Sequence, residues 1–236
     1  MLLNDPQPVA PSETDRLVDG SPEAPATLLL AHGAGAPMDS PFMAAIAMGL
    51  TERGWRVLRF EFPYMARRRQ SGRRSAPDRL PVLLEAFRDQ VARERADPQG
   101  PDRPVLIGGK SLGGRVASLL VDELAAAADV RGCLCLGYPF HPPGRPQQLR
   151  TEHLLTLQTP TLILQGERDG FGRRDEVETY PLAPAVQLEW IPCGDHSFKP
   201  TRSSGLSEAD TWALAAAAGD RFCRATLNLA PLPPAP

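Results

Sequence analysis

Along most of the chain, short runs of apolar residues alternate with longer segments in which apolar residues recur every three or four positions. The short runs indicate buried strands, and the longer segments indicate helices that bury one face. Strands are predicted at 26–32, 56–62, 104–109, 131–138, 161–165 and 186–191, and helices at 41–53, 78–95, 111–127 and 207–228, the last with Ser207 as its N-cap. We therefore predict an α/β fold with a mostly parallel sheet of about six to seven strands and helices on both faces.

This alternation fades at both ends of the chain. Residues 1–25 are rich in Pro, Asp and Ser and are predicted to be irregular, with at most an edge strand, and the Pro-rich tail 229–236 is predicted to be disordered. Residues 26–228 form the predicted domain. The longest gap between strands, 139–160, has room for a Pro-rich loop and one short helix, which is too little for a separate lid domain.

The composition argues against several classes of protein. The 236 residues carry a net charge of −2, with 42% hydrophobic and 23% charged residues, which is typical of globular proteins and unlike a protein that binds nucleic acid through bulk charge. No apolar stretch reaches the length of a membrane span, and the N-terminus lacks the pattern of a secretory signal. We expect a cytoplasmic protein with neither a membrane nor a nucleic-acid partner; its oligomeric state is left open.

The four cysteines, Cys133, Cys135, Cys193 and Cys223, lack the spacing of a metal site, and we expect neither a metal nor a cofactor. Cys133 and Cys135 fall in a predicted buried strand. We expect their side chains to project to opposite sides of the sheet and to remain unpaired structural thiols.

The segment Gly109-Lys110-Ser111-Leu112-Gly113 joins a predicted strand to a predicted helix. In a G-x-S-x-G turn at such a junction, the serine adopts a strained backbone conformation and presents its Oγ at the edge of the sheet. The glycines are needed because side chains there would collide with the neighbouring strand and helix. The segment therefore predicts a nucleophile elbow; the alternative is a Gly-rich helix cap.

Gly109-Lys110-Ser111 also resembles the end of a phosphate-binding P-loop. That motif needs a glycine at position 104, where this chain has Pro104. Without that glycine-rich loop, no ring of N–H donors is available for phosphates, and nucleotide hydrolysis is not expected.

A serine nucleophile needs a base, an acid that orients the base, and donors for an oxyanion. After an elbow, the acid and the histidine follow in that order, in loops at the carboxyl ends of later strands. We predict Asp169 as the acid and His196 as the base. The competing histidines are His32, His141 and His153, and the competing acids are Glu167, Asp175, Glu176 and Asp195, of which Asp195 is too close in sequence to reach the Nδ1 atom of His196 easily.

The oxyanion donors are predicted to be the backbone N–H groups of Leu112 and Ala34. Leu112 follows the serine, and Ala34 lies in the Gly-rich loop 32–36 after the first predicted strand. The alternative for this loop is a plain Gly-rich turn.

A cluster of arginines follows the second predicted strand and should lie at the same edge of the sheet, namely Arg67, Arg68, Arg69, Arg73, Arg74 and Arg79. One interpretation is a rim that attracts a carboxylate or phosphate on the substrate, with Arg73 and Arg74 as binding residues. The other is a solvated charged face. His141, in the Pro-rich loop, is a further candidate for substrate binding.

Five segments of the chain together resemble a set of small α/β-hydrolases related to dienelactone hydrolases: LAHGAGA at 30–36, RFEFPYM at 59–65, GGKSLGGR at 108–115, YPFHPPG at 138–144 and GDHSF at 194–198. That set includes a testis-expressed protein and a subunit of a nuclear histone-acetyltransferase complex. The resemblance spans residues 26–225. It implies an α/β-hydrolase fold with Ser111, Asp169 and His196 as a catalytic triad.

The resemblance does not imply a substrate, and dienelactone hydrolases proper use a cysteine nucleophile where this chain has Ser111. Together, residues and resemblance predict a serine hydrolase that cleaves a small acyl ester or thioester and favours anionic substrates. The alternative is a catalytically silent hydrolase fold that serves as a binding or scaffold protein.

Overall fold

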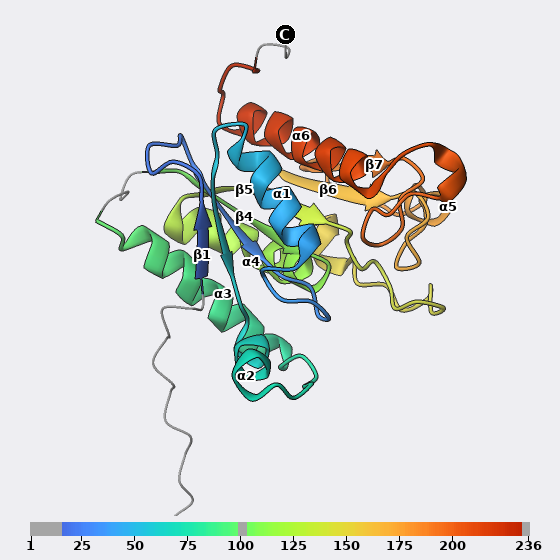
Figure 1. The fold of residues 1–236 in the computed structure, drawn as a ribbon, viewed down its shortest axis with the longest axis horizontal. Coiled ribbons are helices and arrows are strands. Elements are labelled where there is room, and N and C mark those ends of the chain that lie inside the picture. The colour runs from blue at the N-terminus through green and yellow to red at the C-terminus, as the bar shows by residue number, and fades with distance from the viewer. Residues whose placement is uncertain (1–15, 99–102, 233–236) are drawn as a thin grey trace, which may run out of the picture.

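The computed structural model describes residues 16–98 and 103–232. Within them, seven strands form one sheet in the order β1-β3-β2-β4-β5-β6-β7 (Figure 1). The strands are β1 (Arg16–Asp19), β2 (Thr27–Ala31), β3 (Arg56–Phe60), β4 (Val105–Lys110), β5 (Val130–Leu136), β6 (Thr161–Gly166) and β7 (Val186–Ile191). All neighbouring pairs are parallel except β1 and β3, so β1 is an antiparallel edge strand.

Helices cover both faces of the sheet, with α1 and α6 on one face and α3 and α4 on the other (Figure 1). The helices are α1 (Pro41–Thr51), α2 (Pro63–Ser71), α3 (Leu80–Arg95), α4 (Leu112–Ala128), α5 (Arg174–Val177) and α6 (Glu208–Thr226), with short 3-10 helices at Glu152–Leu155 and Arg202–Ser204. None of the helices in the described ranges has the length and apolarity that a membrane crossing requires.

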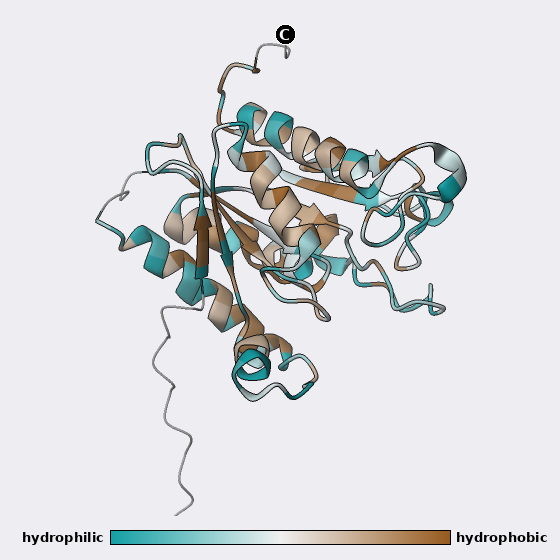
Figure 2. Cartoon of the chain, viewed as in Figure 1, coloured by the Kyte–Doolittle hydropathy of each residue, from teal (hydrophilic) through white to brown (hydrophobic). Residues whose placement is uncertain are grey.

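The core forms two layers because alternate side chains of each strand face opposite sides of the sheet. In β4, Val105 and Ile107 pack beneath α3 and α4, whereas Leu106 packs beneath α1 and α6. The central strands β2, β4 and β6 are buried along their whole length and consist mostly of apolar residues, which appear as the brown centre of the molecule in Figure 2.

The direction of the chain across the sheet reverses between β2 and β4. From β2 the chain moves outward to β3 and then returns to β4, on the other side of β2. In open α/β sheets, such a reversal leaves a crevice at the carboxyl ends of the two strands. Because Ala31 pairs with Gly109, the loop after β2 and the turn after β4 lie side by side at this crevice.

The structure confirms the predicted α/β fold and the order of its main elements. Within residues 16–98 and 103–232 it also has no separate lid domain, as predicted. Ser207 is the N-cap of α6, where its Oγ accepts the Asp210 N–H at 3.2 Å. β1 is the edge strand that the prediction for residues 1–25 allowed. The other statements about residues 1–15 and 233–236 lie outside the described residues.

The sequence pattern missed α2, which contains the first arginines of the cluster. Pro63 occupies its first turn, where the fixed φ of proline favours a helix, and Gly72 ends it with a φ of 68°. Because most of its residues are polar, α2 has no apolar periodicity to reveal it. Arg67, Arg68 and Arg69 therefore lie on a short helix, and the other arginines of the cluster follow it.

The expectation that Cys133 and Cys135 face opposite sides of the sheet is wrong. Residues two positions apart on a strand share a face. Both side chains accordingly pack beneath α3 and α4, with their sulfur atoms 3.7 Å apart. They are buried, unpaired thiols, and burial raises the pKa of Cys133 well above its ordinary value.

Candidate active site

Ser111 occupies a strained turn between β4 and α4. Its backbone has φ 51° and ψ −111°, in a region that residues with a side chain rarely adopt. The N–H of Ser111 donates to the Leu136 carbonyl at 3.0 Å. A Cβ atom on Gly113 would lie 2.4 Å from the Ala31 carbonyl oxygen, so glycine is required for α4 to begin this close to β2. The turn has the geometry of a nucleophile elbow.

His196 and Asp169 complete a chain of contacts with Ser111. The Nε2 atom of His196 lies 2.9 Å from the Ser111 Oγ, and its Nδ1 atom lies 2.7 Å from the Asp169 Oδ2. The histidine belongs to the loop after β7, and the aspartate to the loop after β6. The structure thus brings together the three residues predicted from the sequence, although His196 is 27 positions from Asp169 and 85 positions from Ser111 along the chain.

Asp169 is fully buried and is held by several donors. Its Oδ1 accepts the Phe171 N–H at 2.8 Å, and its Oδ2 accepts the Gln165 Nε2–H at 2.9 Å. Because the Asp169 Oδ2 faces the Nδ1 atom of His196 at 2.7 Å, it favours the tautomer that carries its proton on Nδ1. The Nε2 atom is then free to accept the proton of the Ser111 hydroxyl.

The competing acids make other contacts. The Oδ1 of Asp195 accepts the N–H groups of Ser197 and Lys199, at 2.8 and 3.0 Å, and so shapes the histidine loop rather than contacting the imidazole. Glu167 accepts the Cys193 N–H at 2.8 Å. Of the remaining two, Asp175 lies near an arginine and Glu176 contacts a histidine outside the cavity.

The competing histidines lie in other environments. His153 contacts Ser118, in the middle of α4, at 2.8 Å, and burial lowers its pKa to about 4. His141 is buried, with its Nε2 atom 3.1 Å from the Glu176 Oε2. His32 is buried in the loop after β2.

The loop after β2 is fixed by contacts from two side chains. His32 donates from Nδ1 to the Gly33 carbonyl at 2.6 Å and accepts the Phe62 N–H on Nε2 at 3.1 Å, which requires a neutral ring. Burial lowers the pKa of His32 and keeps it neutral. The Tyr64 hydroxyl donates to the Ala34 carbonyl at 3.2 Å. This loop is therefore held rigidly beside the serine.

The predicted oxyanion donors lie on the two sides of Ser111. Ala34 lines the cavity next to the serine, and Leu112 is the first residue of α4. Among the hydrogen bonds of the described residues, none uses the N–H of Leu112 or Ala34. Both groups are available to a ligand, and the N-terminus of a helix favours negative charge.

A cavity of about 430 Å³ opens beside Ser111. Its walls are mostly apolar and include Phe42, Met43 and Phe171. The Phe171 ring lies against the imidazole of His196, with 4.2 Å between the ring centroids. A space of this size and polarity suits a small apolar group better than a polymer.

Three predicted binding residues do not line this cavity, namely Arg73, Arg74 and His141. Arg73 and Arg74 are exposed residues that follow α2, and His141 is buried against Glu176. The cluster nevertheless approaches the site through Arg68, whose guanidinium donates to the carbonyl of Gly35, a cavity residue, at 3.3 Å.

Two other members of the arginine cluster, Arg67 and Arg69, form ion pairs with carboxylates. Arg69 contacts Glu61 at 2.6 Å and Asp39 at 2.9 Å, and Arg67 contacts Asp78 at 2.5 Å. Part of this positive charge is therefore neutralised locally.

Four residues at the site were not singled out by the sequence analysis, namely Lys110, Tyr64, Gln165 and Phe171. Lys110 stood inside the elbow motif, and Tyr64 and Phe171 stood in segments already assigned to the catalytic edge. Their positions were therefore visible, but their contacts depend on the arrangement of separate loops.

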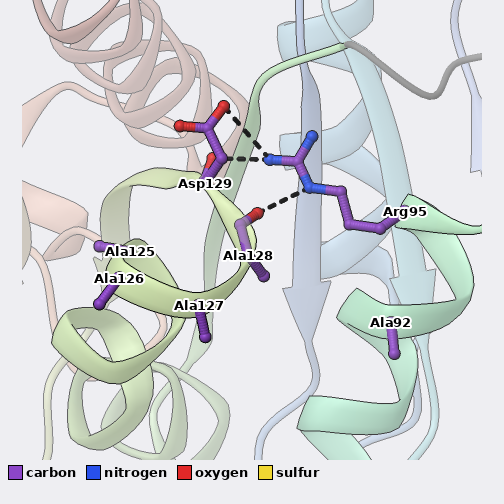
Figure 3. Close-up of a pocket in the computed structure, with 7 residues that line it drawn as sticks. All are labelled: Ala92, Arg95, Ala125, Ala126, Ala127, Ala128 and Asp129. Carbon is purple, nitrogen blue, oxygen red and sulfur yellow. Dashed lines mark hydrogen bonds and ion pairs between the residues drawn. The ribbon is translucent and has the colours of Figure 1, made fainter.

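A second hollow lies between α3 and the carboxyl end of α4 (Figure 3). Since Ser111 precedes this 17-residue helix, the two sites are about 25 Å apart along its axis. Arg95 lines the hollow and donates to the Ala128 and Asp129 carbonyls at 2.7 and 2.6 Å. The polar groups of this hollow therefore bond to one another. Within 16–98 and 103–232, no cluster of His, Cys, Asp or Glu could hold a metal ion.

Several solved structures share the fold of this chain. An α/β serine hydrolase without a lid from Xanthomonas campestris is 21% identical, with a TM-score of 0.61 over 92% of this chain and 90% of that chain. A dienelactone hydrolase from Anabaena variabilis is 20% identical, with a TM-score of 0.64 over 88% and 89% of the two chains. Est1E from Butyrivibrio proteoclasticus is 14% identical, with a TM-score of 0.65 over 90% and 94%. At these identities the likeness shows the fold.

The sequence pattern of the α/β hydrolase domain matches residues 24–224, which include the turn at Ser111, the loop after β2 and the loops of Asp169 and His196. The match covers most of the chain. This protein therefore belongs to the α/β hydrolase domain family.

Proposed function

We propose that this protein is a serine hydrolase that cleaves small acyl esters or thioesters. The observation that carries the proposal is the continuous set of contacts from the Ser111 Oγ through His196 to the buried Asp169. A serine hydroxyl becomes a nucleophile when a neutral imidazole accepts its proton, and the imidazole is effective when a carboxylate fixes its tautomer.

In the proposed mechanism, the Ser111 Oγ attacks the acyl carbonyl while the Nε2 of His196 takes the hydroxyl proton. The N–H groups of Leu112 and Ala34 stabilise the negative charge that develops on the carbonyl oxygen. His196 then gives its proton to the leaving alcohol or thiol, and the acyl group stays on Ser111. A water molecule, deprotonated by His196, attacks this acyl-enzyme and releases the acid.

The cavity and its surroundings support this substrate class. The apolar walls of the cavity favour a short acyl group. Because no lid domain covers the site in the described residues, the size of the leaving group is less restricted than that of the acyl group. Among solved structures with the same fold, one shows ferulic acid bound to Est1E, at 15% identity and a TM-score of 0.65. That fold is therefore compatible with the binding of a small carboxylic acid.

A burst experiment tests the proposal directly. Mixing the protein with p-nitrophenyl butyrate should release one equivalent of p-nitrophenol rapidly if deacylation is slower than acylation, and the trapped intermediate should be heavier by one butyryl group. A protein inert toward oxygen esters and thioesters would contradict the proposal and favour the binding or scaffold role.

The pH dependence of hydrolysis should report the proton on His196. Burial lowers the pKa of His196 below its ordinary value of 6.5, and Lys110 lowers it further, whereas Asp169 raises it. Because the base must be neutral, kcat/KM should fall as the pH falls through this pKa. We therefore expect an acid limb with its midpoint below 6.5, measured with p-nitrophenyl acetate at constant ionic strength. A midpoint well above that value would contradict the assignment of His196.

We further propose that the arginine cluster makes anionic acyl substrates better than neutral ones. Arg73 and Arg74 are exposed near the end of α2, and Arg68 of the same cluster contacts the cavity loop at Gly35. Exposed charges act over about 8–10 Å at physiological ionic strength, so the effect is one of attraction rather than of direct contact.

The double variant Arg73→Ala/Arg74→Ala should raise KM for a hemisuccinate ester about two- to fivefold and leave kcat unchanged. KM for a neutral ester of equal size should not change, and the difference should shrink as salt rises. The matched control is Arg131→Ala/Arg221→Ala, which removes the same charge from residues outside the cavity. Equal effects of the two double variants would contradict the anionic preference.

A further inference from the structure

Lys110, the residue before Ser111, lines the cavity, and its ammonium group is largely buried there. The residue is 8% exposed, and its Nζ donates to the carbonyl oxygen of His196. The same nitrogen lies 5.4 Å from the centroid of the Phe42 ring. A Cβ atom on Gly137 would be 2.8 Å from the Nζ, so the missing side chain at that position makes room for the ammonium. Lys110 therefore connects the end of β4, just before Ser111, to the loop that carries His196.

The burial of this ammonium is costly. An amine removed from water must recover its solvation from hydrogen bonds and opposite charges, and Lys110 has one protein acceptor among the described residues. The charged groups that face it are Asp169, Asp195 and, when protonated, His196. Burial lowers the pKa of Lys110 to about 8 even though Asp169 and Asp195 raise it. An apolar side chain such as methionine would fill this space at lower cost.

The histidine loop needs such a support because its backbone is strained. Cys193 and Phe198 both have positive φ values, 54° and 64°, on the two sides of His196. Residues with a side chain occupy this region at a cost, and they remain there when surrounding contacts hold them. The Asp195 carboxylate supplies two of these contacts from within the loop. Lys110 supplies a further contact from outside the loop, because its Nζ donates to the His196 carbonyl. Lys110 is the last residue of β4, and Ser111 follows it directly.

We propose that Lys110 is a positioning residue, which holds the His196 loop over Ser111. This role rests on the proposed function, since it concerns the alignment of base and nucleophile. A misplacement of about 1 Å between reacting groups can reduce a rate by about 100-fold. The role also has an electrostatic consequence, because a positive charge close to the imidazole disfavours a second proton on it and keeps His196 in its basic form at lower pH.

The experiment compares Lys110→Met, which removes both the charge and the donor, with Lys110→Gln, which removes the charge and keeps a donor. The control is Lys199→Met, because Lys199 is the other lysine of the chain, lies near His196 in sequence, and is exposed and paired with Glu208. The His196 imidazole is titrated by NMR in each variant, with His196→Asn used to assign its signal. Hydrolysis of a neutral p-nitrophenyl ester gives kcat and KM.

In both Lys110 variants, the titration midpoint of His196 should rise by about half a pH unit, because a nearby positive charge has been removed. In Lys110→Met, kcat should fall about tenfold with little change in KM, and Lys110→Gln should recover part of that loss. Lys199→Met should match the wild type in both measurements. Thermal unfolding is measured for each variant to check that it is folded.

Two results would overturn the positioning role: a midpoint that does not move in Lys110→Met, or a kcat that does not fall. A fall in kcat with an unchanged midpoint would mean that Lys110 only fills space. The failure of the proposed function is distinguishable, because the NMR titration needs no turnover. An active wild type with an unchanged Lys110→Met contradicts the role of Lys110 alone, whereas an inactive wild type contradicts the proposed function from which that role derives.

Discussion

Replacing Ser111 with alanine should reduce ester hydrolysis by at least about 10³-fold, while replacing Ser118 with alanine should leave it nearly unchanged. The Ser111 Oγ lies 2.9 Å from the Nε2 of His196 beside the cavity, so its loss removes the proposed nucleophile. Alanine keeps the Cβ and the N–H group of the elbow. The variant should therefore fold as the wild type does, with the same strain at this residue.

Ser118 is the matched control because it also contacts a histidine. Its Oγ lies 2.8 Å from the Nε2 of His153, on the same helix that begins at Leu112, yet neither residue lines the cavity. Rates measured with p-nitrophenyl butyrate, together with thermal unfolding, separate the two serines. If Ser111→Ala hydrolysed as well as the wild type, or if Ser118→Ala alone were inactive, the nucleophile would be misassigned.

Replacing Asp169 with asparagine should lower kcat by about 10³- to 10⁴-fold with little change in KM. The Oδ2 of Asp169 accepts from both the Nδ1 of His196 and the Nε2 of Gln165. An asparagine NH₂ group in place of this Oδ2 would face two other N–H donors, those of His196 and Gln165. The imidazole would then turn or adopt the other tautomer. The Nε2 atom would then no longer accept the proton of Ser111.

Asp195→Asn is the control for this change. It removes a neighbouring carboxylate that contacts backbone N–H groups, and the amide oxygen of asparagine can still accept from Ser197 and Lys199. We expect its kcat to lie within about threefold of the wild type, since the loop is retained. A larger loss in Asp195→Asn than in Asp169→Asn, by steady-state kinetics, would assign the orienting acid to Asp195.

The parts of this structure that the sequence predicted depend on local patterns. Buried parallel strands are continuous apolar runs, so β4 and its neighbours could be identified without a structure. Asp169 and His196 could be chosen because the chemistry needs an acid and a base, in that order, at carboxyl ends of strands. The geometry of the loops then brought them to the serine.

The parts that the sequence did not predict depend on packing between separate loops. Helix α2 is too polar to show an apolar period, and His141 is buried against Glu176 although it stands in a Pro-rich loop. Arg73 and Arg74 stand at the expected edge, but they lie beyond α2 and away from the cavity walls. No local pattern could show that the ammonium of Lys110 reaches the carbonyl of His196, because that contact joins residues 86 positions apart.

The most direct test of the central claim is to map the site of covalent modification by a fluorophosphonate. Such a probe phosphonylates a serine that a neighbouring base has activated. Intact mass spectrometry of the treated protein should show one adduct, and tandem mass spectrometry of the digest should place it on Ser111; His196→Ala should greatly slow its formation. An adduct on a different serine, or an unmodified protein under conditions that label a control esterase completely, would contradict the assignment of Ser111 as an activated nucleophile.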